Sequence, residues 1–112
     1  RYGGLTPGRD TLQMDIVLSY GLTEFLRMLS FAESKGWSRR DLIPHAGHQL
    51  ALHVSSGLGL GGHETASVSD TPFSGVSVDT KIEDGYAYLS DKPGIGIEYK
   101  PSLYKYFDGM LN

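Results

Sequence analysis

The sequence contains no cysteine among its 112 residues. This absence excludes disulfide bridges, cysteine-ligated zinc and a thiol nucleophile. Positive charge is also scarce, since 10 Lys and Arg stand against 13 Asp and Glu, and only Arg39 and Arg40 are adjacent. The net charge of −3 and the missing basic stripe predict no nucleic-acid partner. A local site for an anionic small molecule remains compatible with this composition.

Long apolar runs are missing too. No run approaches the roughly 18 residues that a membrane-spanning helix needs, so we expect no membrane partner. The first residues show no charged-then-apolar signal pattern, and together with the lack of cysteine this predicts a cytoplasmic protein. The chain begins at Arg1 rather than Met, and we expect it to be a piece of a longer polypeptide. An apolar content of 39% and a charged content of 21% are typical of a globular domain.

The first two thirds of the chain predict alternating strands and helices. Short apolar or mixed runs bounded by turn residues are typical of strands, and apolar residues at helical spacing are typical of helices. Because consecutive strands separated by helices run parallel, we expect a parallel sheet with helical crossovers. The predicted order is a strand at 11–15, a helix at 20–35, a strand at 42–45, a helix at about 48–58 and a strand at about 63–66.

The pattern changes after about residue 67. Short strand-like runs include Val76 and Val78, and Glu83-Asp84-Gly85 is a hairpin turn signal between 81–82 and 86–87. Residues 102–111 can form an amphipathic helix. We therefore expect two parts, a barrel fragment at 1–66 and a capping tail at 67–112. Three parallel strands cannot cover both faces and pair their edges, so the fold class predicted is α/β, the closing part of a larger barrel.

Two polar side chains end neighbouring predicted strands. Asp15 and His45 are separated by one crossover helix, and the ends of adjacent parallel strands meet at one edge of a sheet. A carboxylate that binds one imidazole nitrogen fixes the tautomer and raises the basicity of the other nitrogen. This arrangement is what a general acid or base near neutral pH requires. The alternative is a structural Asp beside a solvent-facing loop His.

Glu64 ends the next predicted strand. Its carboxyl group could hydrogen-bond a substrate oxygen if it is held protonated, or orient a partner if it is ionised, and the alternative is a surface Glu after a glycine turn. His45, His48, His53 and Glu64 could instead be metal ligands. However, His48 and His53 are poorly placed on one helical face, and no H-E-x-x-H pattern occurs. The zinc signal is weak, and His53 is predicted to be a helix residue packed against the sheet.

The glycine cluster at 57–62 formally satisfies G-x-G-x-x-G. A dinucleotide-binding loop requires a strand before this motif and a helix after it. Here the predicted helix precedes the cluster and the predicted strand follows, so we reject a nucleotide site. We expect the glycines to permit a tight return and close backbone packing.

The chain resembles, over essentially its whole length, the C-terminal region of the enolase superfamily. The resemblance is to the mandelate racemase/muconate lactonizing enzyme-like subgroup, and within it to the acid-sugar dehydratases of the D-tartrate dehydratase type. The segments that carry it are Leu-Gln-Met-Asp at 12–15, Leu-Ser-Tyr-Gly-Leu at 18–22, Ile-Pro-His-Ala-Gly-His-Gln at 43–49 and Gly-Leu-Gly-Leu-Gly-Gly-His-Glu at 57–64, with Glu-Asp-Gly at 83–85 and Pro-Gly-Ile-Gly at 93–96 in the tail.

This resemblance implies a modified (β/α) TIM-like barrel, of which the chain would hold about strands 6 to 8, plus a tail that contributes to a capping domain. Asp15, His45 and Glu64 would end the sixth, seventh and eighth strands. An upstream Lys would remove the proton α to the carboxylate of a small sugar acid, with Mg²⁺ stabilising the enolate. His45 with Asp15 would protonate the departing β-hydroxyl, and Glu64 would hydrogen-bond the enolate oxygen. The full-length enzyme would be a homo-oligomer.

The chain also departs from the family pattern, and these departures limit what activity and substrate we expect of it. The three metal-binding carboxylates and the Lys motif belong to the second to fifth strands, which this chain lacks, so the isolated chain is expected to be inactive. Ala46 and His63 stand where the family often has Gly and Asn. Two alternatives stay open: a racemase or epimerase with His45 as the base, and a non-catalytic fragment or interaction module.

Overall fold

The computed structural model describes residues 3–65 and 71–111. These residues form two compact units, one of 3–45 with 55–64 and one of 46–54 with 65 and 71–111. Helices and short strands are mixed, which confirms the predicted α/β class, whereas the domain boundary near residue 66 stays a prediction. No helix in the described ranges is long and apolar enough to cross a membrane. The elements are β1 (Leu12–Met14), α1 (Leu22–Ser34), η1 (Arg39–Asp41), β2 (Leu42–Pro44), α2 (Gln49–Leu58), β3 (Lys81–Glu83), β4 (Tyr86–Tyr88), η2 (Ile97–Tyr99) and α3 (Pro101–Leu111).

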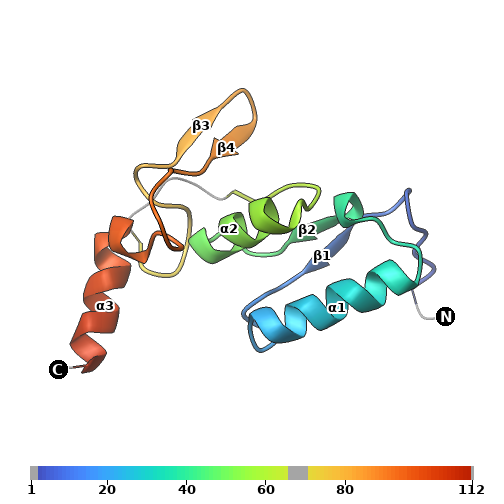
Figure 1. Ribbon diagram of the computed structural model, residues 1–112, viewed down its shortest axis with the longest axis horizontal. Helices are drawn as coiled ribbons and strands as arrows, with labels where there is room; N and C mark the ends of the chain where they lie inside the picture. The colour runs from blue at the N-terminus through green and yellow to red at the C-terminus, as the bar shows by residue number, and fades with distance from the viewer. Residues whose placement is uncertain (1–2, 66–70, 112) are drawn as a thin grey trace. The chain divides into compact units, whose positions relative to one another are not determined.

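In the first unit, β1 and β2 pair in parallel (Figure 1). Leu12 lies opposite Leu42 and Met14 opposite Pro44, and the His45 N–H donates to the Met14 carbonyl at 3.0 Å. The predicted parallel pairing is therefore confirmed, although each strand is shorter than expected and ends just before its polar residue. Gln13 in β1 is exposed and its two neighbours are half-buried, and in the described part of the chain only one edge of β1 is paired.

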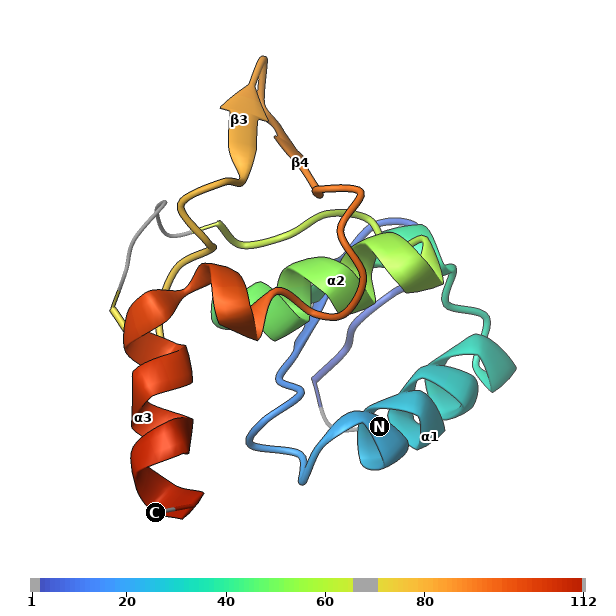
Figure 2. The same ribbon diagram turned by 60° about the vertical axis from the view of Figure 1, so that its left-hand side comes forward.

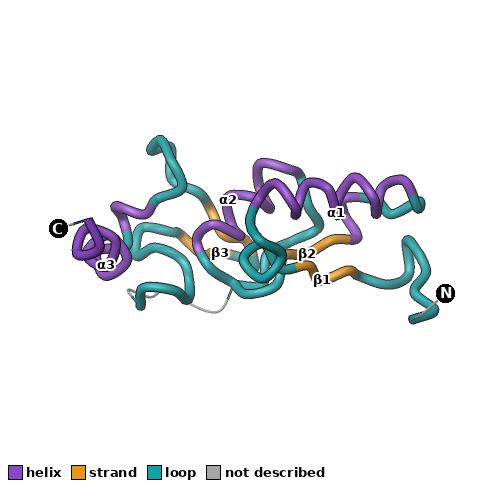
Figure 3. The backbone as a smooth tube through the Cα atoms, turned by 90° about the horizontal axis from the view of Figure 1, so that it is seen from below, coloured by secondary structure: helices purple, strands orange, loops and turns teal. Residues whose placement is uncertain are grey.

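Helix α1 lies along one face of β1 and β2 (Figure 3). Its buried residues Phe25, Leu29 and Ala32 face inward, and burying Phe25 and Leu29 contributes about 2 kcal/mol each. The helix predicted at 20–35 is confirmed, but Leu22 and Leu26, whose helical spacing with Phe25 and Leu29 predicts burial on the same face, are exposed. The core cluster is formed by Leu29, Ala32 and Leu42, with Leu12, Met14, Trp37, Leu58 and Leu60 packed against it.

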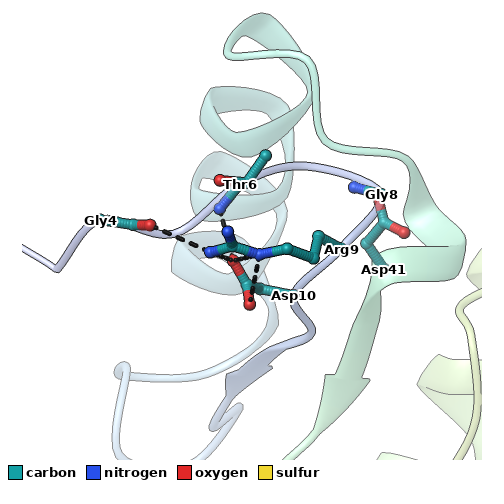
Figure 4. Close-up of polar contacts among 6 residues, drawn as sticks. All are labelled: Gly4, Thr6, Gly8, Arg9, Asp10 and Asp41. Carbon is teal, nitrogen blue, oxygen red and sulfur yellow. Dashed lines mark hydrogen bonds and ion pairs between the residues drawn. The ribbon is translucent and has the colours of Figure 1, made fainter.

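The loop before β1 is held by a local polar cluster (Figure 4). The Asp10 carboxylate accepts hydrogen bonds from the Thr6 N–H at 2.6 Å and from the Arg9 guanidinium at 2.8 Å. These two bonds, of which the one from Arg9 has the larger effect, lower the pKa of Asp10. The Asp41 carboxylate accepts from the Gly8 N–H at 3.3 Å. The loop is thereby tied to η1, which directly precedes β2.

The segment after α2 comes beside β2 without forming the predicted third strand. The Gly61 N–H donates to the Leu42 carbonyl at 2.9 Å, but residues 63–65 carry no strand, and Ala66 lies outside the described residues. Strands of three residues offer few ladder bonds, so a neighbouring segment gains little from full pairing. A Cβ on Gly61 would lie 2.0 Å from the Arg40 carbonyl oxygen. The predicted close backbone packing of the glycine cluster is confirmed at this position.

The second unit contains an antiparallel hairpin of β3 and β4 (Figure 2). Its two-residue turn has φ of 50° at Asp84 and 79° at Gly85, as a type I′ turn requires. The predicted hairpin is therefore confirmed, and α3 begins one residue before the predicted start. Of the two valines predicted in strand-like runs, Val76 forms only an isolated β-bridge and Val78 lies in a turn.

Candidate functional site

Asp15 and His45 are in contact at the ends of β1 and β2. The Asp15 Oδ2 lies 2.8 Å from the His45 Nδ1. Each residue directly follows its strand, so the parallel register places both side chains at the same edge. The Asp15 side chain is 13% exposed and the His45 side chain 50% exposed. The contact that the sequence predicts is confirmed, while a catalytic role for either residue stays a prediction.

The Asp15 carboxylate uses its two oxygens for different partners. Oδ2 binds His45, and Oδ1 accepts a hydrogen bond from the Leu18 N–H at 2.7 Å. Burial raises the pKa of Asp15. The hydrogen bonds from His45 and from the Leu18 and Val17 N–H groups lower it, and together they outweigh burial, so the pKa of Asp15 lies below its ordinary value. Asp15 is therefore ionised at neutral pH.

The pKa of the His45 imidazole is shifted in the opposite direction, upward. The hydrogen bond to Asp15 raises the pKa of His45, desolvation opposes this, and the negative charges of Glu64 and Asp15 raise it further. Both shifts favour an aspartate–imidazolium pair. Because Nδ1 faces Asp15, Nε2 is the ring nitrogen through which a proton can be exchanged with a bound molecule.

Glu64 is exposed and lies close enough to His45 for its charge to raise the pKa of the imidazole. The prediction that Glu64 ends a strand is wrong for the described residues, because 63–65 lie outside any strand. The carboxylate nevertheless acts electrostatically on the ring that Asp15 orients. Its catalytic role stays a prediction.

A histidine metal centre receives no support. Within 3–65 and 71–111, no group of three or more His, Asp or Glu side chains is placed to hold a metal ion. His53 instead lies 3.1 Å, Nε2 to Nε2, from the amide of Gln49 within α2. Burial lowers the pKa of His53, so the imidazole is neutral at neutral pH and accepts from the amide. The Asp15 carboxylate is, in addition, already engaged by His45.

The sequence reasoning missed two polar residues that organise these segments. Gln49 is buried, and its Oε1 accepts from the Ser77 N–H at 2.8 Å. The sequence feature that could have indicated its contact with His53 is their spacing of four residues on a helix. Ser19 closes the loop after Asp15 through its hydroxyl group. The sequence feature that could have indicated this role is a Ser four residues after an Asp in a turn.

Two residues near the Asp15–His45 pair have left-handed backbone without being glycine. They are Tyr20, with φ of 66°, and Ala46, with φ of 61°. Such a conformation costs a residue with a side chain about 1–2 kcal/mol. Glycine would adopt this conformation at position 46 without that cost.

One comparison with known proteins bears on this site. The model of a protein family described as enolase C-terminal domain-like matches residues 6–103 of this chain. The match covers Asp15, His45 and Glu64 together with all elements from β1 to η2 and the first residues of α3.

Proposed function

The chain belongs to the enolase C-terminal domain-like family, and from this premise we propose that it is the proton-donating part of an acid-sugar dehydratase of the D-tartrate dehydratase type. The enzyme would depend on Mg²⁺, whose ligands we expect outside this chain. The substrate class is a small sugar acid with a hydroxyl group β to its carboxylate. A cytoplasmic location and a homo-oligomeric full-length form stay predictions.

The observation that supports this proposal is the 2.8 Å contact between Asp15 and His45. After the proton α to the carboxylate is lost to a base outside this chain, His45 donates its Nε2 proton to the β-hydroxyl. The C–O bond breaks with its electron pair on oxygen, water leaves, and the enolate electrons form the C=C bond. The raised pKa keeps His45 protonated for this step, and the Asp15 charge stabilises the imidazolium until the transfer.

Glu64 completes the proposed acid site. Its charge favours the protonated form of His45 before the transfer. The hydrogen bond from Glu64 to an enolate oxygen, which the resemblance implies, would require the protonated carboxyl group as the donor, because a carboxylate only accepts. A neutral Gln at this position keeps the hydrogen-bonding shape and removes the charge, so Glu64→Gln should lower the pKa of His45.

One edge of β1 has no paired strand among the described residues, and this supports the barrel part of the proposal. The Met14 carbonyl bonds to β2, and since backbone directions alternate along a strand, the N–H and C=O of exposed Gln13 face the other edge. Beside this edge lies an open apolar groove of about 420 Å³. We propose that a preceding parallel strand and its helix fill it. The groove is lined by Leu12, Met14, Met28, Phe31, Ala32 and Trp37, among others.

The decisive test uses His45→Asn in the complete enzyme, incubated with tartrate and other sugar acids in D₂O. Removing the acid should abolish the loss of water, while exchange of the α-proton with deuterium continues because another residue removes that proton. His63→Asn is the matched control, since it places the residue common in resembling sequences beside Glu64, and it should retain turnover.

Three results would contradict the proposal. Wild-type dehydration by His45→Asn would remove His45 from the mechanism. Inversion or exchange without water loss by the unaltered enzyme would identify a racemase or epimerase. Tight stoichiometric Mg²⁺ binding by the isolated chain in calorimetry would show that the metal ligands lie within it.

A further inference from the structure

The loop that follows Asp15 closes on itself through one hydroxyl group. The half-buried Ser19 donates its hydroxyl hydrogen to the Asp15 backbone carbonyl, and the Ile16 carbonyl lies 3.3 Å from the same oxygen. The Gly21 N–H donates to the Ile16 carbonyl at 2.8 Å. The chain therefore turns within a few residues of the carboxylate, and Ser19 is the side chain that ties this turn to the backbone of Asp15.

This turn determines where the carboxylate of Asp15 points. The Leu18 N–H holds Oδ1 at 2.7 Å, which leaves Oδ2 directed at the His45 Nδ1 at 2.8 Å. If the Leu18 amide moved, the carboxylate could rotate, and the geometry of both bonds would change together. Leu18 and Ser19 are adjacent, so the hydroxyl bond of Ser19 limits the movement of that amide.

We propose that Ser19 is a positioning residue for the Asp15–His45 pair, because its hydroxyl group fixes the turn that aims the carboxylate at the imidazole. The inference rests on the proposed function only for its effect on turnover. The orienting effect itself can be measured on the chain alone. The Ser19 hydroxyl bonds to the backbone carbonyls of Asp15 and Ile16, so its proposed effect on the imidazole acts through Asp15.

The test is a pH titration of the His45 imidazole by NMR in the 112-residue chain. Ser19→Ala should lower the pKa of His45, in the same direction as Asp15→Asn but by less. Ser19→Thr, which keeps a hydroxyl, should restore the unaltered titration. The matched control is Ser34→Ala, because the hydroxyl of the exposed Ser34 in α1 also donates to a backbone carbonyl, that of Phe31 at 2.7 Å. This control should leave the titration of His45 unchanged.

An unchanged His45 titration in folded Ser19→Ala, measured while Asp15→Asn shifts it, would overturn the inference. Should Ser19→Ala fail to fold, Ser19→Cys keeps the volume with a weaker donor and is expected to give the same downward shift. A titration like that of the unaltered chain in Ser19→Cys would then overturn the inference.

Turnover of the complete enzyme separates this inference from the proposed function. Ser19→Ala should lower kcat by roughly tenfold, since small displacements of a catalytic group are costly. Full turnover in Ser19→Ala, with none in His45→Asn, would refute the positioning role and leave the dehydratase proposal intact. Full turnover in His45→Asn would refute the dehydratase proposal, while the NMR titration still tests Ser19.

Discussion

Replacing Gly61 by alanine tests the close packing between the segment after α2 and the end of η1. The added Cβ would lie 2.0 Å from the Arg40 carbonyl oxygen and 2.8 Å from its carbonyl carbon. Both atoms belong to the backbone, so no side-chain rotation relieves the overlap, and the chain must shift by about 1 Å to reach the 3.0 Å that real contacts keep. Overpacking of this kind costs about 2 kcal/mol. Weakening the Gly61 N–H bond to Leu42 costs about 1 kcal/mol more.

We therefore expect Gly61→Ala to lower the free energy of unfolding by about 3 kcal/mol, which is a large share of the usual stability of a domain. For a chain of this size the midpoint of thermal unfolding should fall on the order of 10 °C. Urea denaturation followed by circular dichroism measures the difference directly.

Two glycines of the same cluster are matched controls. A Cβ on Gly57 meets no atom of the described residues within 4 Å, and one on Gly62 makes only ordinary contacts with Ile43. Gly57→Ala should be neutral or stabilising by about 0.5–1 kcal/mol, since Gly57 lies in α2. If Gly61→Ala were as stable as Gly57→Ala, the packing argument would be refuted.

Further predictions concern titration and turns. Asp15→Asn should destabilise the chain most between pH 3.8 and 6.5, which are the ordinary pKa values of Asp and His. The raised pKa of His45 adds stability that is lost as pH rises through that pKa. The lowered pKa of Asp15 adds stability that is lost as pH falls through that pKa. Urea unfolding at several pH values checks this, and a pH-independent difference would contradict it. In NMR titrations, His45 should become protonated at higher pH than His53, whose pKa burial lowers; the reverse order would show that the two environments are misassigned. Gln49→Leu should cost about 1–3 kcal/mol, because it removes the acceptor of a buried amide, and an unchanged unfolding free energy would argue against that bond. Gly85→Ala should cost about 1 kcal/mol, because φ is 79° there, and thermal unfolding of the two chains measures it.

Local sequence signals were sufficient where one physical constraint dominates. Asp84-Gly85 predicted the hairpin because few residue pairs accept positive φ at both turn positions. The meeting of Asp15 and His45 followed from two short strands separated by one helix, since that order leaves parallel pairing as the simple arrangement.

The remaining features depend on neighbours that a local pattern does not specify. Leu22 and Leu26 have the spacing of a buried helix face, yet they are exposed because the burial of α1 is set by which side of it meets β1 and β2. The strand expected at 63–66 required continuous backbone hydrogen bonds to β2. The residue pattern of the segment cannot show whether those hydrogen bonds form. The role of Gln49 depends on Ser77, which lies 28 residues away in the sequence.

The parallel register of β1 and β2 offers a way to detect misaligned strands in a protein preparation. A slip of one residue would turn every side chain of one strand to the opposite face, so that Leu12 would leave the apolar layer and Asp15 would no longer stand level with His45. The raised pKa that the hydrogen bond to Asp15 gives to His45 therefore also indicates that the two strands are correctly aligned. A preparation in which part of the His45 signal titrates normally would contain misaligned molecules, even if its helix content were complete.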